Sequence, residues 1–102
     1  MAHYLIKKTY LDGPHAGKSY YLTKGGYVVD LDKTHFESDT YKTLGHAKRR
    51  CDQLYMDNFA NIRWERFDEQ LNIKKGLRPK KHFIYYEESY EPVEVDAISD
   101  HI

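Results

Sequence analysis

The chain has 102 residues, 40% of them hydrophobic, and its 16 Lys and Arg side chains balance its 16 Asp and Glu side chains. This size suits one folded domain with one core and leaves no room for a separate cofactor domain. No apolar run approaches the ~18 residues of a membrane span, the start lacks a signal-peptide pattern, and the single cysteine suits a reducing compartment. We therefore expect a cytoplasmic protein that does not enter a membrane.

Residues 4–31 predict a three-stranded antiparallel meander. The third strand alternates most clearly, so Tyr27, Val29 and Leu31 are predicted to point inward and the residues between them outward. Lys24-Gly25-Gly26 precedes this strand, and its glycines supply the positive φ of a tight reversal.

The connection between the first two strands ends in Gly17-Lys18-Ser19, the closing residues of a phosphate-binding loop. That motif needs four residues between its two glycines, whereas only three separate Gly13 from Gly17. The aromatic, β-prone residues after Ser19 also stand where the motif needs a helix. The sequence therefore predicts a hairpin turn over residues 12–18 and no nucleotide cofactor.

A helix is predicted over residues 44–57, with Thr43 as its N-cap. Its apolar positions recur with a period of 3.6 residues, which indicates a face packed on the sheet. These positions are Leu44, Ala47, Cys51, Leu54 and Tyr55. Residues 59–73 leave two alternatives open. A helix is loosely indicated by Phe59, Ile62, Phe67 and Leu71, whereas Ala60, Ile62 and Trp64 favour a strand over 61–67, which Arg66 interrupts.

The last third of the chain predicts a basic loop over residues 74–81 and a final strand over 82–88. After Pro92 the acids and small residues offer little to bury, so the chain is expected to fray. The predicted fold is α+β, an antiparallel sheet of three to five strands packed against one amphipathic helix. It forms a single domain over residues 1–92, followed by a frayed acidic tail over 93–102.

Residues that could carry chemistry do not converge in the sequence. None of the six histidines has a second His or Cys three or four positions away, which is the usual spacing of zinc ligands. Cys51 lies in the apolar stripe of the predicted helix, where a buried thiol is unreactive. The sequence therefore predicts no metal, no cofactor and no enzymatic activity.

Charge is unevenly distributed, because every Lys and Arg lies before residue 82 and residues 83–102 carry six acids. Carboxylates in a row imitate a phosphate backbone, so the acidic, tyrosine-rich end predicts a protein-binding site for a partner with a basic surface. The predicted site comprises Tyr85, Tyr86, Glu87, Glu88, Tyr90 and Glu91.

The basic residues support an alternative, a nucleic-acid-binding module, because Lys and Arg side chains neutralise phosphates. One group lies on a face of the predicted helix and the other in the basic loop. They are Lys48, Arg49, Arg50, Lys74, Lys75, Arg78, Lys80 and Lys81.

Three short strands followed by Tyr41-Lys42-Thr43-Leu44-Gly45-His46-Ala47 resemble the sheet-to-helix junction of AP2-type and integrase amino-terminal DNA-binding domains, over about residues 20–56. The resemblance implies DNA contacts from basic and aromatic residues of the exposed sheet face, where this chain carries Val28, Asp30 and Asp32. The chain also resembles small phage and mobile-element accessory proteins. That resemblance implies a small non-enzymatic binding protein, such as a phage-encoded inhibitor of a host defence system of the anti-CRISPR kind.

Overall fold

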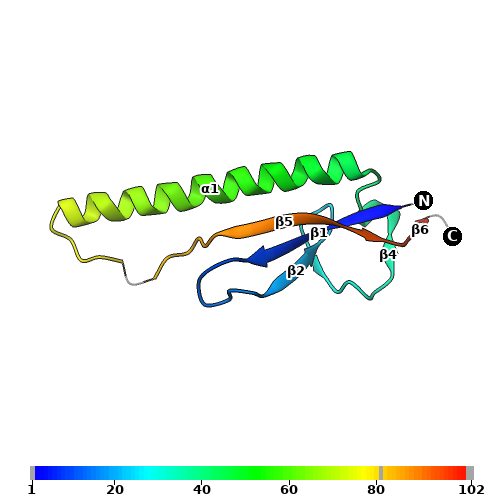
Figure 1. Cartoon of the computed structure of the whole chain (residues 1–102), viewed down its shortest axis with the longest axis horizontal. Helices are drawn as coiled ribbons and strands as arrows, with labels where there is room; N and C mark the ends of the chain where they lie inside the picture. The colour runs from blue at the N-terminus through cyan, green and yellow to red at the C-terminus, as the bar shows by residue number, and fades with distance from the viewer. Residues whose placement is uncertain (1, 81, 101–102) are drawn as a thin grey trace.

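The computed structural model describes residues 2–80 and 82–100. One long helix lies along a four-stranded antiparallel sheet, which confirms the α+β class (Figure 1). The sheet has the order β3-β2-β1-β5, and a separate parallel pair joins β4 to β6. The strands are β1 (His3–Tyr10), β2 (Ser19–Leu22), β3 (Val28–Val29), β4 (His35–Phe36), β5 (Glu88–Val95) and β6 (Ala97–Ile98). A 3-10 turn covers Glu37–Asp39, and the molecule measures 62 × 23 × 20 Å.

The predicted hairpin connects β1 to β2. The Tyr10 amide donates to the Lys18 carbonyl at 3.0 Å, and the Gly17 amide donates to the Tyr10 carbonyl at 2.8 Å. Gly13 has a φ of 81°, and a Cβ there would overlap the ring of Tyr86. Glycine is therefore required at this position both by the backbone conformation and by close approach of a side chain.

The inward orientation predicted for the third strand holds for Val29 but is wrong for Tyr27 and Leu31. Only Val28 and Val29 pair with β2, so Tyr27 and Leu31 lie beyond the ladder. Their side chains are 75% and 39% exposed, while Val29 is partly buried. Residues 27, 29 and 31 do recur as apolar positions with a period of two. Because β3 contains only two residues, it is too short to bring the apolar positions on either side of it into the core.

The last sheet strand lies later in the chain than predicted. β5 pairs with β1 over all eight residues, from Glu88 opposite Tyr10 to Val95 opposite His3. Residues 82–87 form no strand, and residues 93–95 and 97–98 lie in β5 and β6, so the predicted fraying over residues 93–98 is wrong. Pro92 had indicated the end of regular structure. An edge strand tolerates proline because one of its edges makes no ladder bonds.

The helix α1 (Leu44–Lys74) begins where predicted and ends much later. The Thr43 hydroxyl accepts a hydrogen bond from the His46 amide at 3.1 Å, which confirms the N-cap. No proline or glycine interrupts the chain between Gly45 and Gly76, and the helix continues through residues 61–67, so the predicted strand there is wrong. Gly76, with a φ of 76°, follows its C-terminal end.

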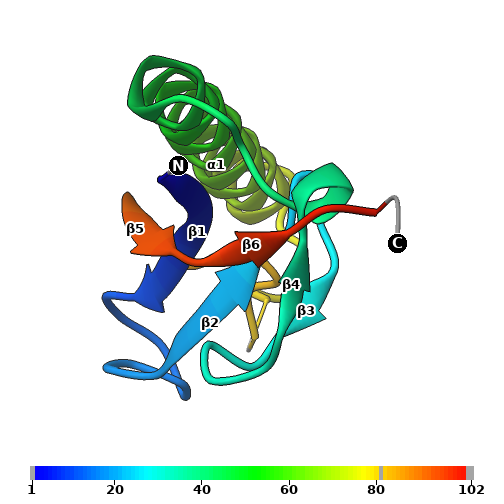
Figure 2. The same ribbon diagram turned by 90° about the vertical axis from the view of Figure 1, so that its right-hand side faces the viewer.

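The N-terminal half of α1 packs on one side of the sheet (Figure 2). The core there contains Ile6, Tyr41, Ala47 and Cys51, with partly buried side chains of Tyr4, Leu22, Leu54 and Tyr90 packed against it. Burial of Cys51 is confirmed. Leu44 and Tyr55 are 40% and 51% exposed, so the buried stripe is narrower than predicted.

Candidate protein-binding surface

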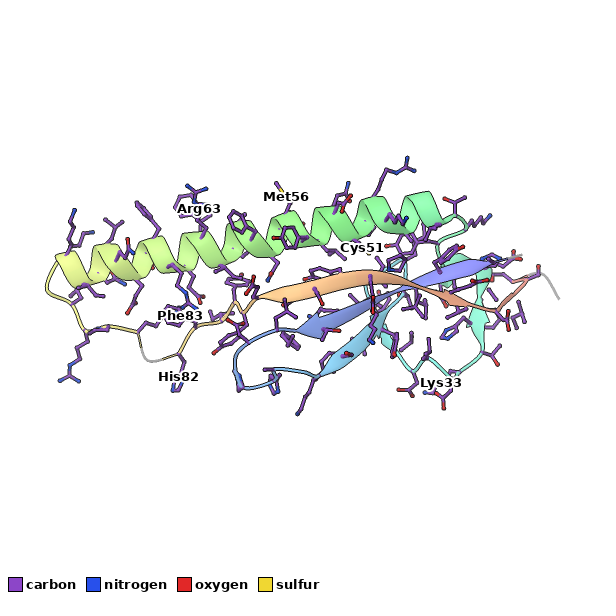
Figure 3. All side chains as sticks on the ribbon, viewed as in Figure 1. Lys33, Cys51, Met56, Arg63, His82 and Phe83 are labelled. Atoms are coloured by element: carbon purple, nitrogen blue, oxygen red, sulfur yellow. The ribbon has the colours of Figure 1, made fainter. Side chains whose placement is uncertain are left out.

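The C-terminal half of α1 presents large apolar side chains to solvent. They recur three or four residues apart and so share one helix face. We call this face the outer stripe, and it consists of Met56, Phe59, Ala60, Trp64, Phe67 and Leu71. Its five large members are between 36% and 71% exposed, with Trp64 the most exposed. Met56 and Arg63 point away from the sheet in Figure 3, which also shows Cys51 on the opposite side of the helix.

The outer stripe is apolar and also forms a shallow groove. The rings of Trp64 and Phe67 meet edge to face, with centroids 6.1 Å apart. Together with Met56, Phe59, Ala60 and Arg63 they line a shallow groove of about 550 Å³. A surface of this kind gains free energy when an apolar partner covers it.

The opposite face of the same half-helix is occupied by the chain itself. Residues 77–80 and 82–87, here called the return segment, run back beneath α1 toward the sheet (Figure 1). Asn58 donates to the Tyr86 carbonyl at 2.8 Å and accepts from the Glu88 amide at 3.1 Å. Glu65 accepts from the Ile84 amide at 2.8 Å, and Glu69 accepts from the Lys80 amide. These three side chains form a polar seam that supplies backbone bonds to a segment outside any strand.

Two further contacts join the return segment to α1. The Lys80 ammonium lies 3.6 Å from a carboxylate oxygen of Glu65. The Arg66 guanidinium lies 3.3 Å from the centre of the Phe83 ring, a cation–π contact. The chain covers this face only in part, because a cavity of about 300 Å³ lined by Asn58, Ile62, Arg66 and Tyr85 remains beneath α1. The outer stripe is the more exposed apolar side of the half-helix and therefore the side offered to a partner.

The predicted acidic site does not form a continuous free surface. Glu88 is mostly buried, receives a hydrogen bond from the Tyr90 hydroxyl and lies 3.6 Å from the Lys8 ammonium. Glu91 pairs with Lys7 at 3.7 Å but remains exposed, as does Glu87. Lysines of the neighbouring strand β1 thus neutralise two of the three acids.

The tyrosines of the predicted acidic site have different environments. Tyr85 is 39% exposed, whereas Tyr86 is partly buried with its ring against Gly13. Tyr90 packs on the core, where burial, reinforced by its hydrogen bond to Glu88, raises the pKa of its phenol. Burial likewise raises the pKa of the Cys51 thiol, with smaller contributions from Asp52 and Glu91. The thiol therefore stays protonated and a poor nucleophile.

The predicted nucleic-acid-binding residues fall into two separate groups. Lys48, Arg49 and Arg50 lie in the first turns of α1, and Lys74 is its last residue rather than part of a loop. At 1.5 Å per residue, these groups are roughly 36–39 Å apart. Lys75, Arg78 and Lys80 are exposed beside Lys74, and Lys81 lies outside the described residues.

Sequence reasoning missed the outer stripe, although its signal was present. The loose helical pattern of residues 59–73 combines Phe59, Phe67 and Leu71 of the stripe with Ile62 of the inner face, and it leaves out Met56 and Trp64. The helix has two apolar faces on opposite sides, one in each half. Such an arrangement defeats a search for one stripe along the whole segment.

Comparisons with protein-family models, with curated proteins and with solved structures gave no match for this chain. The family resemblances drawn from the sequence therefore stay predictions. Within residues 2–80 and 82–100, no helix has both the length and the apolar character needed to cross a membrane. In the same part of the chain, no three His, Cys, Asp or Glu side chains gather as metal ligands would.

Proposed function

We propose that the chain is a non-enzymatic protein-binding module and that the outer stripe of α1 is its principal binding surface. The observation that carries the proposal is the exposure of five large apolar side chains on one helix face, while the opposite face is bonded to the return segment. Their exposed parts amount to roughly 500–600 Å² if a fully buried aromatic side chain covers about 200 Å². Patches of that size on a monomer are commonly interaction sites.

The chemistry of the stripe indicates the kind of partner. Aromatic residues, Met and Arg are enriched at the centres of protein interfaces, and Trp and Arg dominate their binding energy. Trp64, Phe67 and Arg63 provide this combination. The partner surface is therefore expected to be an apolar helix or groove on a folded protein.

The acidic residues are proposed as a secondary contact for a basic patch on the partner. Glu87 and Glu91 are the exposed members of the predicted site, since Glu88 is held by Tyr90 and Lys8. Exposed acids of this kind mainly accelerate association and set orientation. A more specific form of the proposal is a phage-encoded inhibitor that covers a host defence protein with these two surfaces.

Three charge-changing variants test the proposal. Each variant is immobilised, and the partner protein that it captures is compared with the protein captured by the wild-type chain. Phe67→Asp should abolish capture, Glu87→Lys with Glu91→Lys should weaken it and make it less sensitive to salt, and Tyr27→Asp is the matched control. Tyr27 is an exposed aromatic residue outside α1. Circular dichroism confirms that each variant is folded.

The nucleic-acid alternative is an arm of the same experiment, with Lys48, Arg49 and Arg50 changed to Glu. Affinity for DNA or RNA that falls steeply with salt and is lost only in this arm would overturn the proposal, because each neutralised phosphate releases a counterion. Capture that survives Phe67→Asp unchanged would also overturn it.

A further inference from the structure

We propose that the partner of the outer stripe is the outer stripe of a second copy of the chain, with the two α1 helices antiparallel. This inference rests on the proposed function, since it names the partner of the same surface. A two-fold axis between Arg63 and Trp64 would relate the copies. Such an interface is isologous, so the stripe must be complementary to itself about that point.

The sizes of the side chains meet this requirement. With the axis between residues 63 and 64, a residue of one copy lies level with a residue of the second copy when their two residue numbers add up to 127. Ala60, the one small member of the stripe, then lies opposite Phe67 of the second copy, and Met56 lies opposite Leu71. A large side chain opposite a small one is the arrangement that lets facing helices interdigitate.

The charges at the two ends of the stripe favour the antiparallel direction. In this register Asp52 lies close to Lys74 of the second copy, and the contact occurs twice. Both residues are exposed in the monomer. A parallel pair would instead set Lys74 beside Lys74 and Arg49 beside Arg49, and like charges at an interface are unfavourable.

Arg63 occupies the centre of the proposed interface. Trp64 of the second copy lies at the same level, and an indole face attracts a guanidinium. The two Arg63 side chains also approach one another, which weakens the contact. Arg63→Met removes both the repulsion and the cation–π contact, so it should change the dissociation constant of the dimer far less than Phe67→Asp does.

The area available places the proposed dimer among small interfaces. Covering roughly 500–600 Å² on each copy gives about 1,000–1,200 Å² in total, at the lower end of specific protein interfaces. We therefore expect a dimer that dissociates in the micromolar range.

Sedimentation equilibrium of the full chain from about 1 to 500 µM, a range that brackets a micromolar dissociation constant, measures this association. The wild-type chain and Tyr27→Asp should form dimers, and Phe67→Asp should remain monomeric with an unchanged circular dichroism spectrum. A wild-type chain that is monomeric throughout this range would overturn the inference. So would a dimer that Phe67→Asp does not disrupt.

Cysteine cross-linking tests the direction of the helices. Gln53 and Lys74 are exposed, lie level across the interface in the proposed register, and are about 31 Å apart within one helix, too far for an internal disulfide. The double variant Gln53→Cys with Lys74→Cys should form covalent dimers on mild oxidation, whereas each single variant should not. Cross-linking by the single variants alone would indicate parallel helices and overturn the proposed arrangement.

These results separate the inference from the proposed function. A monomeric wild-type chain that still captures a different protein, and loses it with Phe67→Asp, would end the dimer inference and leave the function standing. If Phe67→Asp changes neither self-association nor capture, both fail.

Discussion

The two halves of α1 are held to the rest of the protein by different interactions. Residues 44–58 lie on the sheet, where Ala47 and Cys51 are buried against Ile6 and Tyr41. Residues 59–74 lie over the return segment, where Glu65 and Glu69 bind backbone amides. One helix is therefore supported by apolar burial along one half and by polar bonds along the other.

The difference explains why one molecule has both a core and an exposed apolar surface. The sheet offers apolar side chains to the first half of α1, so that half turns its apolar residues inward. The return segment offers unpaired backbone groups, which side chains such as Asn58 and Glu65 satisfy. The apolar residues of the second half consequently lie on its outer face.

Removing apolar volume under the first half should have the largest effect. Ile6 is 1% exposed and contacts Tyr41, Ala47 and Cys51 in the core. Ile6→Ala should lower the free energy of unfolding by about 2–4 kcal/mol, measured by urea denaturation, because it leaves a cavity between β1 and α1. Phe67→Ala, at an exposed position of the same helix, is the control and should cost less than about 0.5 kcal/mol in the monomer.

Breaking the polar seam at its junction with the sheet should have a smaller effect. Asn58→Ala removes both hydrogen bonds to the backbone at Tyr86 and Glu88, and leaves these groups unsatisfied. A loss of about 2 kcal/mol is expected. Hydrogen exchange should accelerate at the Glu88 amide but not in the centre of β1. Equal acceleration in both places would mean that the two halves unfold as one unit.

High pH should weaken the sheet half through its buried phenols. Burial raises the pKa of the Tyr41 and Tyr90 phenols above 10 in the folded state. The stabilisation from a neutral buried phenol is complete below the unfolded pKa of about 10 and is lost as the pH rises toward the folded pKa. The free energy of unfolding should therefore fall by up to about 1 kcal/mol for each phenol between pH 8 and 10.5. Tyr90→Phe should flatten the pH dependence. An unchanged slope would contradict the assignment to Tyr90.

The sheet half of the structure was largely predictable from sequence, because its signals are local. Thr43 as N-cap, the glycine turns and the position of Cys51 all follow from neighbouring residues, and the structure confirms each. The pairing of β5 with β1 was not predictable in the same way. It joins residues about 80 positions apart, and Pro92 in an edge strand gives a misleading local signal.

The seam half was not predicted, and the reason is physical. Residues 61–67 show neither a clean helical nor a clean strand pattern, since their inward side chains Glu65 and Arg66 are polar and Trp64 points outward. The return segment, which follows the end of the helix, explains why carboxylates occupy the inner face. The polar inner face therefore carries no apolar period, whereas the outer stripe on the other side of the helix does.

The smallest expected effect on the free energy of unfolding comes from removing the negative charge of Glu65. Glu65 lies 3.6 Å from the Lys80 ammonium and accepts hydrogen bonds from the Ile84 and Tyr85 amides, so its contribution could come from the ion pair or from the backbone bonds. Glu65→Gln keeps an oxygen acceptor and removes the charge. We expect it to cost less than about 1 kcal/mol, because Lys80 is partly exposed and its ion pair is weakened by solvent.

Glu65→Ala removes the acceptor as well as the charge and is the comparison that separates the two contributions. It should cost about 1–2 kcal/mol and accelerate hydrogen exchange at Ile84 and Tyr85, because both amides then lose their acceptor. Exchange at these two amides should stay slow in Glu65→Gln. If Glu65→Gln were as damaging as Glu65→Ala, the charge rather than the backbone bonds would hold the return segment, and the second half of α1 would depend on ion pairing.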